Sequence, residues 1–288
     1  MVFTFKEFTE STYSREPHYF VIGHPISHSL SPLMHQAALD HYGLQGKYVA
    51  IDLQPDEVNS FIAWCSRPQF RGCNITLPYK QLFMDAVDEV TAQARKIGAI
   101  NTIVKEKERL IGHNTDIYGF LKPLEPFRNE LDGREALIFG TGGASRAVVT
   151  ALFEIGIRKV WLVSRSPLGV SNDHPDVEII SYDQWTAVMD SVSIVVNSTP
   201  LGMHPATDRS PVRESEISWL EGRICYDLIY NPLHTKLLSE SQDLALQCIG
   251  GLEMFIHQGS RSFLLWTGRE FPFQKIESKL LSFFSDHA

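Results

Sequence analysis

The sequence has little cysteine and no long apolar run, and each shortage excludes a class of protein. Only four of the 288 residues are cysteines, and they are scattered, with no CxxC pair and no metal-ligand spacing. This pattern argues against a disulfide framework and predicts no metal site, and it favours reduced thiols in a cytoplasmic protein. No stretch approaches the length of a membrane-spanning helix. The first 16 residues lack the apolar core of a signal peptide, and we expect them to form a mobile extension.

An excess of positive charge is also missing. The chain carries 26 Lys and Arg against 34 Asp and Glu, a formal net charge of -8. We therefore expect neither a nucleic acid nor a membrane surface as partner, although a local basic group can still bind an anionic small molecule. The length allows one large or two ordinary domains with a sizeable core. The sequence leaves open whether the chain is a monomer or a homodimer.

One glycine-rich stretch organises the sequence. The apolar run Ala136–Phe139 is typical of a buried strand, and residues 144–155 are typical of a helix. Three glycines lie between them, namely Gly140, Gly142 and Gly143. Glycines allow a close backbone approach to phosphate, and a helix N-terminus attracts anions, so the stretch predicts a dinucleotide pyrophosphate site. The alternative is a simple tight corner, because Ser145 stands where the third glycine of GxGxxG would fall.

The residues around this stretch indicate a doubly wound dinucleotide-binding domain with six strands. The expected strands are residues 136–139, 160–163, 177–180, 193–197, 224–227 and 247–249. An NAD-binding domain of this kind carries an acidic residue at the end of the second strand. This sequence has Ser164-Arg165-Ser166 there instead. A cation can bind the 2′-phosphate of NADP, so we expect NADP(H), with NAD still possible.

The first 115 residues alternate strands and helices, which predicts a second α/β unit. We expect strands at 19–22, 47–53 and 72–77, a hairpin over 101–112, and helices at 33–41, 56–65, 81–90 and 115–127. Ser31 before Pro32 is a candidate N-cap, and residues 129–134 resemble a linker. The last segment, from Gly251, is helical in pattern. We expect a substrate domain formed by residues 1–120 and 252–288, and an NADP domain formed by residues 121–251.

Polar residues gather at the ends of the strands in the first unit, where sites form in α/β folds. Each has an ordinary structural explanation as a turn or capping residue. The set comprises Ser29, Ser31, Asn74, Thr76, Lys80, Asn101, Thr102, Asn114, Thr115 and Asp116.

Taken together, these residues belong to a series of motifs that strongly resembles the shikimate dehydrogenase family. The motifs run in one order from about residue 19 to residue 280. They are GHPISHSLSP (23–32), NITLPYK (74–80), GAINT (98–102), NTDIYG (114–119), GTGGASRA (140–147), NSTPLGM (197–203), DLIYNP (227–232) and MFIHQ (254–258).

The resemblance implies the NADPH-dependent, reversible reduction of 3-dehydroshikimate to shikimate, in aromatic amino acid biosynthesis. It implies that Lys80 and Asp116 are the catalytic pair. The implied substrate-binding residues are Ser29, Ser31, Thr76, Asn101, Tyr230 and Gln258. The implied cofactor-binding residues are Gly140, Gly142, Gly143, Ala144, Ser164, Arg165, Ser166, Met203, Ile229 and Gly251.

Two alternatives remain. A second basic residue that family members commonly carry after Arg165 is missing, since Pro167, Leu168 and Gly169 follow. A quinate/shikimate dehydrogenase that uses NAD is therefore the first alternative, although the plain serines at 29 and 31 favour shikimate. The second alternative is a non-catalytic NADP-binding sensor, against which the retention of Lys80 and Asp116 argues.

Overall fold

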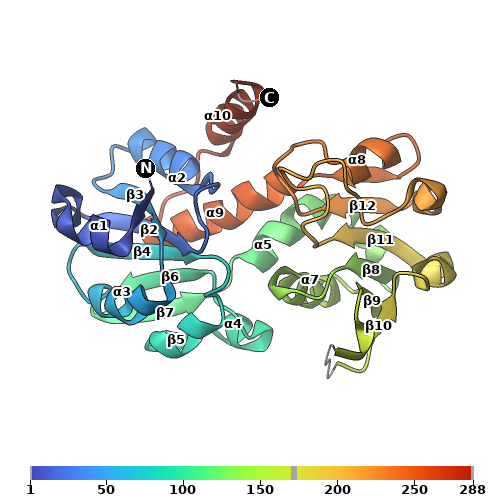
Figure 1. Ribbon diagram of the computed structural model, residues 1–288, viewed down its shortest axis with the longest axis horizontal. Helices are drawn as coiled ribbons and strands as arrows, with labels where there is room; N and C mark the ends of the chain where they lie inside the picture. The colour runs from blue at the N-terminus through green and yellow to red at the C-terminus, as the bar shows by residue number, and fades with distance from the viewer. Residues whose placement is uncertain (1, 170–173, 287–288) are drawn as a thin grey trace. The chain divides into compact units, whose positions relative to one another are not determined.

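The computed structural model of the chain describes residues 2–169 and 174–286, which divide into two compact units (Figure 1). Unit 1 comprises residues 1–115 and 258–288, and unit 2 comprises residues 116–257. The chain therefore passes between the units twice. The domain bounds expected from the sequence fall inside α5 (Asp116–Leu121) and in the first turn of α9 (Gly251–Thr267).

Unit 1 is built on a mixed sheet of seven strands in the order β1-β3-β2-β4-β6-β7-β5. The strands β1, β3, β2 and β4 run parallel, and β6 is antiparallel to β4 and to β7. This confirms the predicted strands and the hairpin. The strands are β1 (Val2–Thr4), β2 (His18–Gly23), β3 (Lys47–Asp52), β4 (Phe70–Ile75), β5 (Glu89–Val90), β6 (Thr102–Glu106) and β7 (Arg109–His113).

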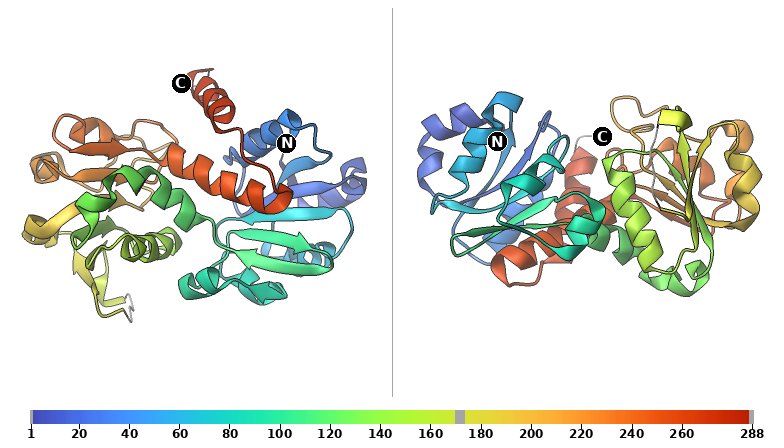
Figure 2. Two further views of the ribbon diagram at one scale, coloured as in Figure 1. Left: turned by 180° about the vertical axis from the view of Figure 1, so that it is seen from behind. Right: turned by 90° about the horizontal axis from the view of Figure 1, so that it is seen from below.

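Helices cover both faces of this sheet (Figure 2). They are α1 (Phe5–Glu10), α2 (Ser31–His41), α3 (Val58–Trp64), α4 (Ala92–Ile97) and the end of α9, with short 3₁₀ helices between them, and α10 (Phe273–Asp286) packs on α2. Successive residues of a strand point to opposite faces of the sheet and therefore contact helices on opposite sides of it. Phe20 packs among the aromatic rings of α1 and α3, whereas Tyr19 contacts Trp266 of α9. Gly72 is required there, because a Cβ would lie 2.3 Å from the Trp266 Nε1.

Two local predictions in unit 1 are wrong. The expected helix over 81–90 is instead a 3₁₀ helix (Leu82–Ala86) followed by β5. Asp88 explains the difference, since its backbone and carboxylate exchange hydrogen bonds of 2.9 and 2.7 Å with Leu110, and this long-range pairing outweighs the local pattern. Ser31 is not the N-cap of α2. Leu30 occupies that position, and Ser31 is the first helical residue.

The N-terminal segment is ordered, so the expectation of a mobile extension is wrong. Residues 2–4 form β1, which pairs in parallel with β3, and α1 follows with a capping box between Thr4 and Glu7. The Phe8 side chain is fully buried, and its ring makes edge contacts with Phe20 and Trp64. The polar residues between the aromatic ones concealed this amphipathic pattern.

Phe8→Ala is accordingly expected to lower the free energy of unfolding by about 3–5 kcal/mol, the usual cost of emptying a large buried site. Tyr13→Ala is the control, because Tyr13 lies in the same segment with an exposed side chain. Urea unfolding followed by tryptophan fluorescence measures both variants. Equal stability of the Phe8 and Tyr13 variants would contradict the burial seen here.

Unit 2 is built on a six-stranded parallel sheet in the order β10-β9-β8-β11-β12-β13. The order reverses beside β8, the first strand in sequence, as in a doubly wound dinucleotide-binding fold. All six predicted strands are confirmed. They are β8 (Glu135–Phe139), β9 (Lys159–Ser164), β10 (Val177–Ser181), β11 (Val192–Asn197), β12 (Ile224–Asp227) and β13 (Gln247–Ile249).

Helices also flank this second sheet (Figure 2). They are α5, α6 (Arg128–Leu131), α7 (Gly143–Glu154), α8 (Lys236–Ser241) and the start of α9, together with 3₁₀ helices at Lys122–Phe127, Pro167–Gly169, Trp185–Ser191 and Glu214–Leu220. The helix expected over 115–127 is confirmed for its first half and continues as a 3₁₀ helix from Lys122, next to Pro123. The expected linker over 129–134 is partly helical, because α6 extends to Leu131.

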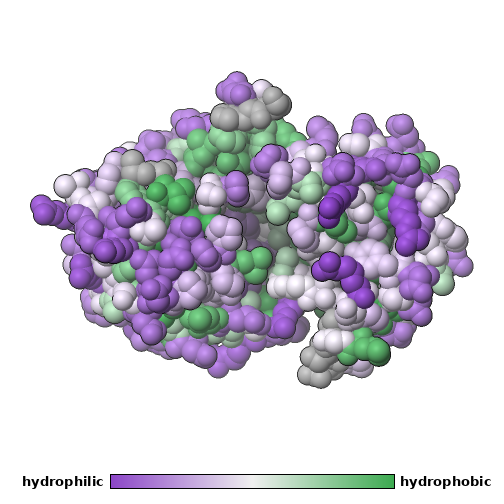
Figure 3. All heavy atoms as spheres, viewed as in Figure 1, coloured by the Kyte–Doolittle hydropathy of each residue, from purple (hydrophilic) through white to green (hydrophobic). Residues whose placement is uncertain are grey.

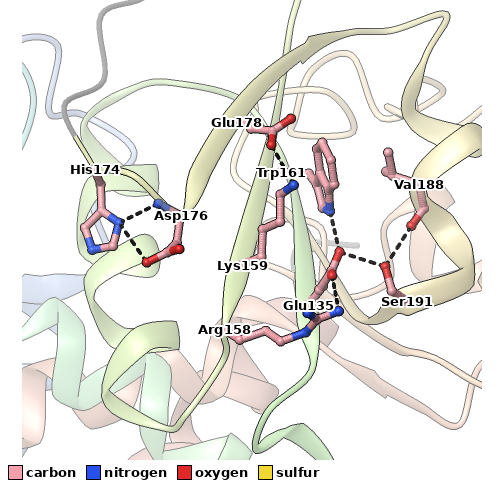
Figure 4. A network of polar contacts seen from close by, with 9 residues as sticks. All are labelled: Glu135, Arg158, Lys159, Trp161, His174, Asp176, Glu178, Val188 and Ser191. Carbon is pink, nitrogen blue, oxygen red and sulfur yellow. Dashed lines mark hydrogen bonds and ion pairs between the residues drawn. The ribbon is translucent and has the colours of Figure 1, made fainter.

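A buried carboxylate near the amino ends of this sheet joins β8 to β9 and to the 3₁₀ helix that precedes β11 (Figure 4). Glu135 of β8 accepts hydrogen bonds from the Trp161 indole of β9 at 2.8 Å and from the Ser191 hydroxyl at 2.7 Å. Its second oxygen is paired with Arg158. Burial raises the pKa of Glu135, but the hydrogen bonds and the Arg158 charge lower it by a larger amount. The pKa of Glu135 therefore lies below its ordinary value of 4.5.

Glu135→Gln is expected to lower the free energy of unfolding by about 1–3 kcal/mol at pH 7, because an amide presents N–H groups to one of the three donors. The folded pKa is depressed, so the ionised form stabilises the fold above the ordinary pKa, and this contribution disappears as the pH falls through the folded value. The difference between variant and wild type should therefore shrink between pH 7 and pH values below 4.5. Urea titrations of the variant and the wild type at pH 7 and at a pH below 4.5 measure this change in the stability difference. Glu178→Gln, which breaks an exposed pair with Lys159, is the control and should change little.

Hydrophilic side chains cover most of the face seen in Figure 3, and hydrophobic ones form scattered patches. Among the described residues, no helix combines the length and the apolar character that crossing a membrane would require. The same part of the chain holds no group of three or more His, Cys, Asp or Glu side chains placed to bind a metal ion.

Candidate functional site

The turn after β8 is the first part of the candidate site. Gly140 has a φ of +108°, a conformation that favours glycine. A Cβ there would also lie 2.7 Å from the Ser198 Oγ. Ser198 follows β11, and its hydroxyl donates to the Phe139 carbonyl at 2.8 Å. The turn is thus fastened to the neighbouring strand end, on the side where the strand order reverses.

The glycine turn leads directly into α7. Gly142 is its N-cap residue, and a Cβ on Gly142 would meet no described atom within 4 Å, so the space above the helix N-terminus is open. Gly143 and Ala144 are the first two helical residues. Ser145, 2% exposed, donates from its hydroxyl to the Gly142 carbonyl at 2.6 Å. Ser145, which replaces the third glycine of GxGxxG, is therefore small enough to pack there, and its hydroxyl has a hydrogen-bond partner. The free N–H groups of the first helical turn remain available to an anion.

A pocket of about 510 Å³ opens at the carboxyl ends of β8, β9 and β11. It brings together half of the predicted cofactor residues, namely Gly140, Gly142, Ser164, Arg165 and Ser166. Ser164 ends β9, and its Oγ accepts the Ser166 N–H at 3.2 Å, which shapes the loop that carries the exposed Arg165. Among the described residues that line the pocket, Arg165 is the one charged side chain.

Sequence reasoning missed part of this lining. Thr141, Tyr182, Ser198 and Thr199 also face the pocket. Ser198 and Thr199 belong to the quoted motif NSTPLGM, which was a usable signal, whereas nothing local distinguishes Tyr182 from a core tyrosine. Burial raises the pKa of Tyr182, and the positive charge of Arg165 partly offsets this effect.

Three more predicted cofactor residues, Met203, Ile229 and Gly251, lie on or beside the loop that follows β12. Asp227 anchors this loop, since its carboxylate accepts from the Ile229 N–H at 3.0 Å, from Asn197 at 3.0 Å and from Thr235 at 2.7 Å. Burial raises the pKa of Asp227 to about 6 despite these bonds. Gly251 donates to the Ile229 carbonyl at 3.1 Å, and a Cβ on Gly251 would lie 2.2 Å from the Leu228 carbonyl oxygen.

Two side chains of this region differ in their surroundings. Met203 is 46% exposed, whereas Ile229 is buried. Tyr230, a predicted substrate residue, stacks on Phe255 of α9 with ring centroids 4.7 Å apart. Both of these rings belong to unit 2, whereas the remaining predicted substrate residues belong to unit 1.

Three predicted substrate residues in unit 1 lie beyond the ends of β2 and β4. The Ser29 Oγ accepts the Ser31 N–H at 3.3 Å, which places the two serines side by side at the start of α2. Thr76 follows β4 and donates its N–H to the Ile22 carbonyl at 2.9 Å. Gly23 is required opposite it, because a Cβ there would lie 2.5 Å from the Thr76 methyl group.

Asn101 is a buried centre of this region. Its amide donates to the Thr115 hydroxyl at 2.9 Å, and its carbonyl oxygen accepts the Thr115 N–H at 2.7 Å. The preceding residue, Ile100, donates its N–H to the Lys80 carbonyl at 2.9 Å. The backbone thus holds Lys80 next to Asn101, and Asp116 directly follows Thr115. Gln258 lies on α9, and its backbone carbonyl accepts from the Ser262 hydroxyl at 3.2 Å.

Two family models match segments of the chain. A model described as "Shikimate dehydrogenase substrate binding domain" matches residues 21–103, and one described as "Shikimate 5'-dehydrogenase C-terminal domain" matches residues 251–281. Two curated relatives are named "Shikimate dehydrogenase (NADP(+))". The protein from Synechocystis is 35% identical over 271 residues, with 91% of this chain and 93% of the relative covered. The protein from Moorella thermoacetica is 38% identical over 263 residues, with 88% of both chains covered.

Solved structures have the same fold. A chorismate mutase/shikimate 5-dehydrogenase fusion protein from Clostridium acetobutylicum has a TM-score of 0.86 at 29% identity, covering 94% of this chain and 99% of the other. A shikimate 5-dehydrogenase from Thermus thermophilus, in complex with NADP(H) and shikimate, has a TM-score of 0.80 at 34% identity, covering 92% and 99%. A quinate dehydrogenase from Corynebacterium glutamicum, in complex with NAD, has a TM-score of 0.82 at 28% identity, covering 93% and 99%.

Proposed function

The chain belongs to the shikimate dehydrogenase family, and from this premise we propose that it catalyses the reversible, NADP-dependent reduction of 3-dehydroshikimate to shikimate. The observation that carries the proposal is the extent of the similarity. Relatives named for this activity match about nine-tenths of the chain at 35–38% identity, so both units are covered rather than the dinucleotide-binding unit alone.

The pocket of unit 2 fits NADP. The glycine turn and the N-terminus of α7 offer backbone N–H groups to the pyrophosphate, and the open space at Gly142 lets it approach. Arg165 and the hydroxyls of Ser164 and Ser166 suit the 2′-phosphate, and the described lining holds no carboxylate that would repel it. NADPH, when bound, supplies the hydride. Gly143, Ala144, Met203, Ile229 and Gly251 complete the proposed cofactor residues.

Lys80 and Asp116 are the proposed catalytic pair. Negative charge develops on the ketone oxygen as the ketone is reduced, and the Lys80 ammonium stabilises that charge and donates a proton to the oxygen. Asp116 holds the ammonium in position, and the neutral lysine regains a proton from the solvent through the Asp116 carboxylate, which accounts for the one proton that the overall reduction consumes. In the direction of oxidation, the neutral lysine removes the hydroxyl proton.

The proposed substrate residues supply hydrogen bonds of the types that shikimate needs. Ser29 and Ser31 present neighbouring hydroxyl donors for its carboxylate. Thr76, Asn101 and Gln258 carry groups that both donate and accept, which suits ring hydroxyls. Tyr230 presents a phenol for the carboxylate end of the substrate.

The test is cofactor reduction, followed by absorbance, with shikimate or quinate and with NADP⁺ or NAD⁺. The highest kcat/KM with shikimate and NADP⁺ is the expected result. A preference for quinate and NAD⁺ would overturn the proposal in favour of the activity for which the Corynebacterium relative is named. Binding of NADP⁺ without turnover of either substrate would instead favour a sensor.

The compartment and the oligomeric state are also proposals. Each of the four cysteines is a free thiol, and three of them are buried, which supports a reducing compartment such as the cytoplasm. We propose a monomer or a homodimer, which light scattering after size-exclusion chromatography distinguishes.

A further inference from the structure

A cluster of buried polar side chains lies beneath the proposed substrate residues of unit 1. The Ser262 hydroxyl on α9 lies 2.8 Å from the Thr102 hydroxyl and 3.2 Å from the Thr115 hydroxyl. The Asn74 amide of β4 donates to Ser262 at 3.0 Å and to Thr102 at 3.1 Å. Ser262 and Thr102 are fully buried, and Asn74 and Thr115 are nearly so. Four separate chain segments therefore meet in one hydrogen-bonded cluster that is shielded from water.

The cluster reaches the substrate residue Asn101 on one side. Thr102 and Thr115 both donate from their hydroxyls to the Asn101 carbonyl oxygen, at 3.1 and 3.2 Å. The Asn101 amide donates back to Thr115 at 2.9 Å. These bonds fix which end of the Asn101 amide presents a donor and which presents an acceptor. Ser262 also donates to the backbone carbonyl of Gln258 at 3.2 Å, so the turn of α9 that carries this second substrate residue is tied to the same cluster.

On the other side, Tyr48 connects the cluster to the substrate residues Ser29 and Ser31. The Tyr48 hydroxyl donates to the Asn74 carbonyl oxygen at 2.6 Å. Burial raises the pKa of Tyr48 well above its ordinary value, and a hydrogen bond with the Ser31 side chain partly offsets this effect. His35, one turn after Ser31 on α2, stacks flat on the Tyr48 ring with centroids 4.5 Å apart. The α2 face that carries Ser31 therefore rests on Tyr48.

We propose that Tyr48 and Ser262 are positioning residues for the substrate, which connect the serines that hold its carboxylate to the asparagine and glutamine that hold its hydroxyls. The inference rests on the proposed function. Neither side chain needs to touch the substrate, because each acts through Ser31, Asn101 or Gln258. A buried network of this kind is rigid only when every member is satisfied, so the loss of one hydroxyl loosens groups at both ends.

Tyr48→Phe tests the link to Ser31, and Tyr19→Phe is its matched control. Tyr19 pairs in register with Tyr48 on the neighbouring strand, and both rings contact Trp266. The Tyr48 variant should raise the KM for shikimate by about 3- to 10-fold, the range of one lost hydrogen bond, with kcat and the KM for NADP⁺ within about twofold of wild type. The Tyr19 variant should leave all three constants unchanged.

Ser262→Thr and Ser262→Val test the centre of the cluster, because the two variants have the same shape and differ only in the hydroxyl group. The threonine variant should keep the KM for shikimate within about threefold of wild type, and the valine variant should raise it by roughly a further tenfold, because buried partners lose their bonds. Urea midpoints of the pair show whether a general loss of stability explains the difference.

The outcomes separate the inference from the proposed function. Wild-type protein that fails to oxidise shikimate overturns the function and the inference with it. Active wild type with equal KM values for shikimate in the Tyr48 and Tyr19 variants, or in the threonine and valine variants, overturns the inference alone. A rise in the KM for NADP⁺ equal to that for shikimate also overturns it, because a positioning role is confined to the substrate.

Discussion

Lys80→Ala is expected to lower kcat for shikimate oxidation by roughly 10²- to 10⁴-fold, the usual contribution of a positioned acid or base. The KM for shikimate should change much less, because Lys80 interacts most strongly when charge has developed on the reacting oxygen. A variant that lowers kcat and kcat/KM together has lost a transition-state interaction. The carbonyl of residue 80 holds Ile100, and alanine keeps this backbone bond, so the neighbouring Asn101 should stay in place.

Initial rates over a range of shikimate and NADP⁺ concentrations measure this effect. Lys96→Ala is the control, because Lys96 is an exposed lysine in the last turn of α4, in the same unit. It should retain wild-type constants. A Lys80 variant with a raised KM and an unchanged kcat would mean that the lysine only binds substrate, and the proposed proton transfer would have to be reassigned.

The fold of unit 2 was predictable because its signals are local. Each strand of a parallel sheet is buried on both faces and reads as an apolar run, and the glycine turn marks which run comes first. The strand order then follows from the fold type, and β8 indeed lies where the order reverses. The pocket residues at the ends of β8 and β9 could be named for the same reason, since ligands bind there in such sheets.

The errors occurred where a segment depends on a distant partner. The strand β5 has two residues and exists because it pairs with β7, and β1 exists because it pairs with β3. Neither pairing leaves a pattern in its own segment. The proposed positioning residues Tyr48 and Ser262 left no signal in the sequence for a related reason. A tyrosine on a strand and a serine on a helix are ordinary residues until the fold places them on either side of Asn74.

Arg165→Asp is expected to lower the ratio of kcat/KM for NADP⁺ to that for NAD⁺ by roughly 10²- to 10³-fold. Loss of hydrogen bonds from a charged donor to the 2′-phosphate costs about 1.5–3 kcal/mol. A carboxylate about 4 Å from the phosphate adds about 1 kcal/mol of repulsion in a solvated pocket. It can also accept a hydrogen bond from the ribose 2′-hydroxyl of NAD⁺, so activity with NAD⁺ should be kept or improved.

The cofactor constants at saturating shikimate decide this prediction, and two further variants locate the effect. Arg165→Gln removes the charge without adding repulsion and should give an intermediate change of about 10- to 100-fold. Arg134→Asp makes the same charge reversal on an exposed arginine just before the amino end of β8, whereas the pocket lies at the carboxyl end of this strand. The Arg134 variant should leave the ratio unchanged. Since Arg165 is the one charged side chain in the described lining, its reversal should dominate the selectivity. A ratio unaffected by Arg165→Asp would mean that the 2′-phosphate is bound elsewhere, and the assignment of the β9 loop to the adenosine ribose would be wrong.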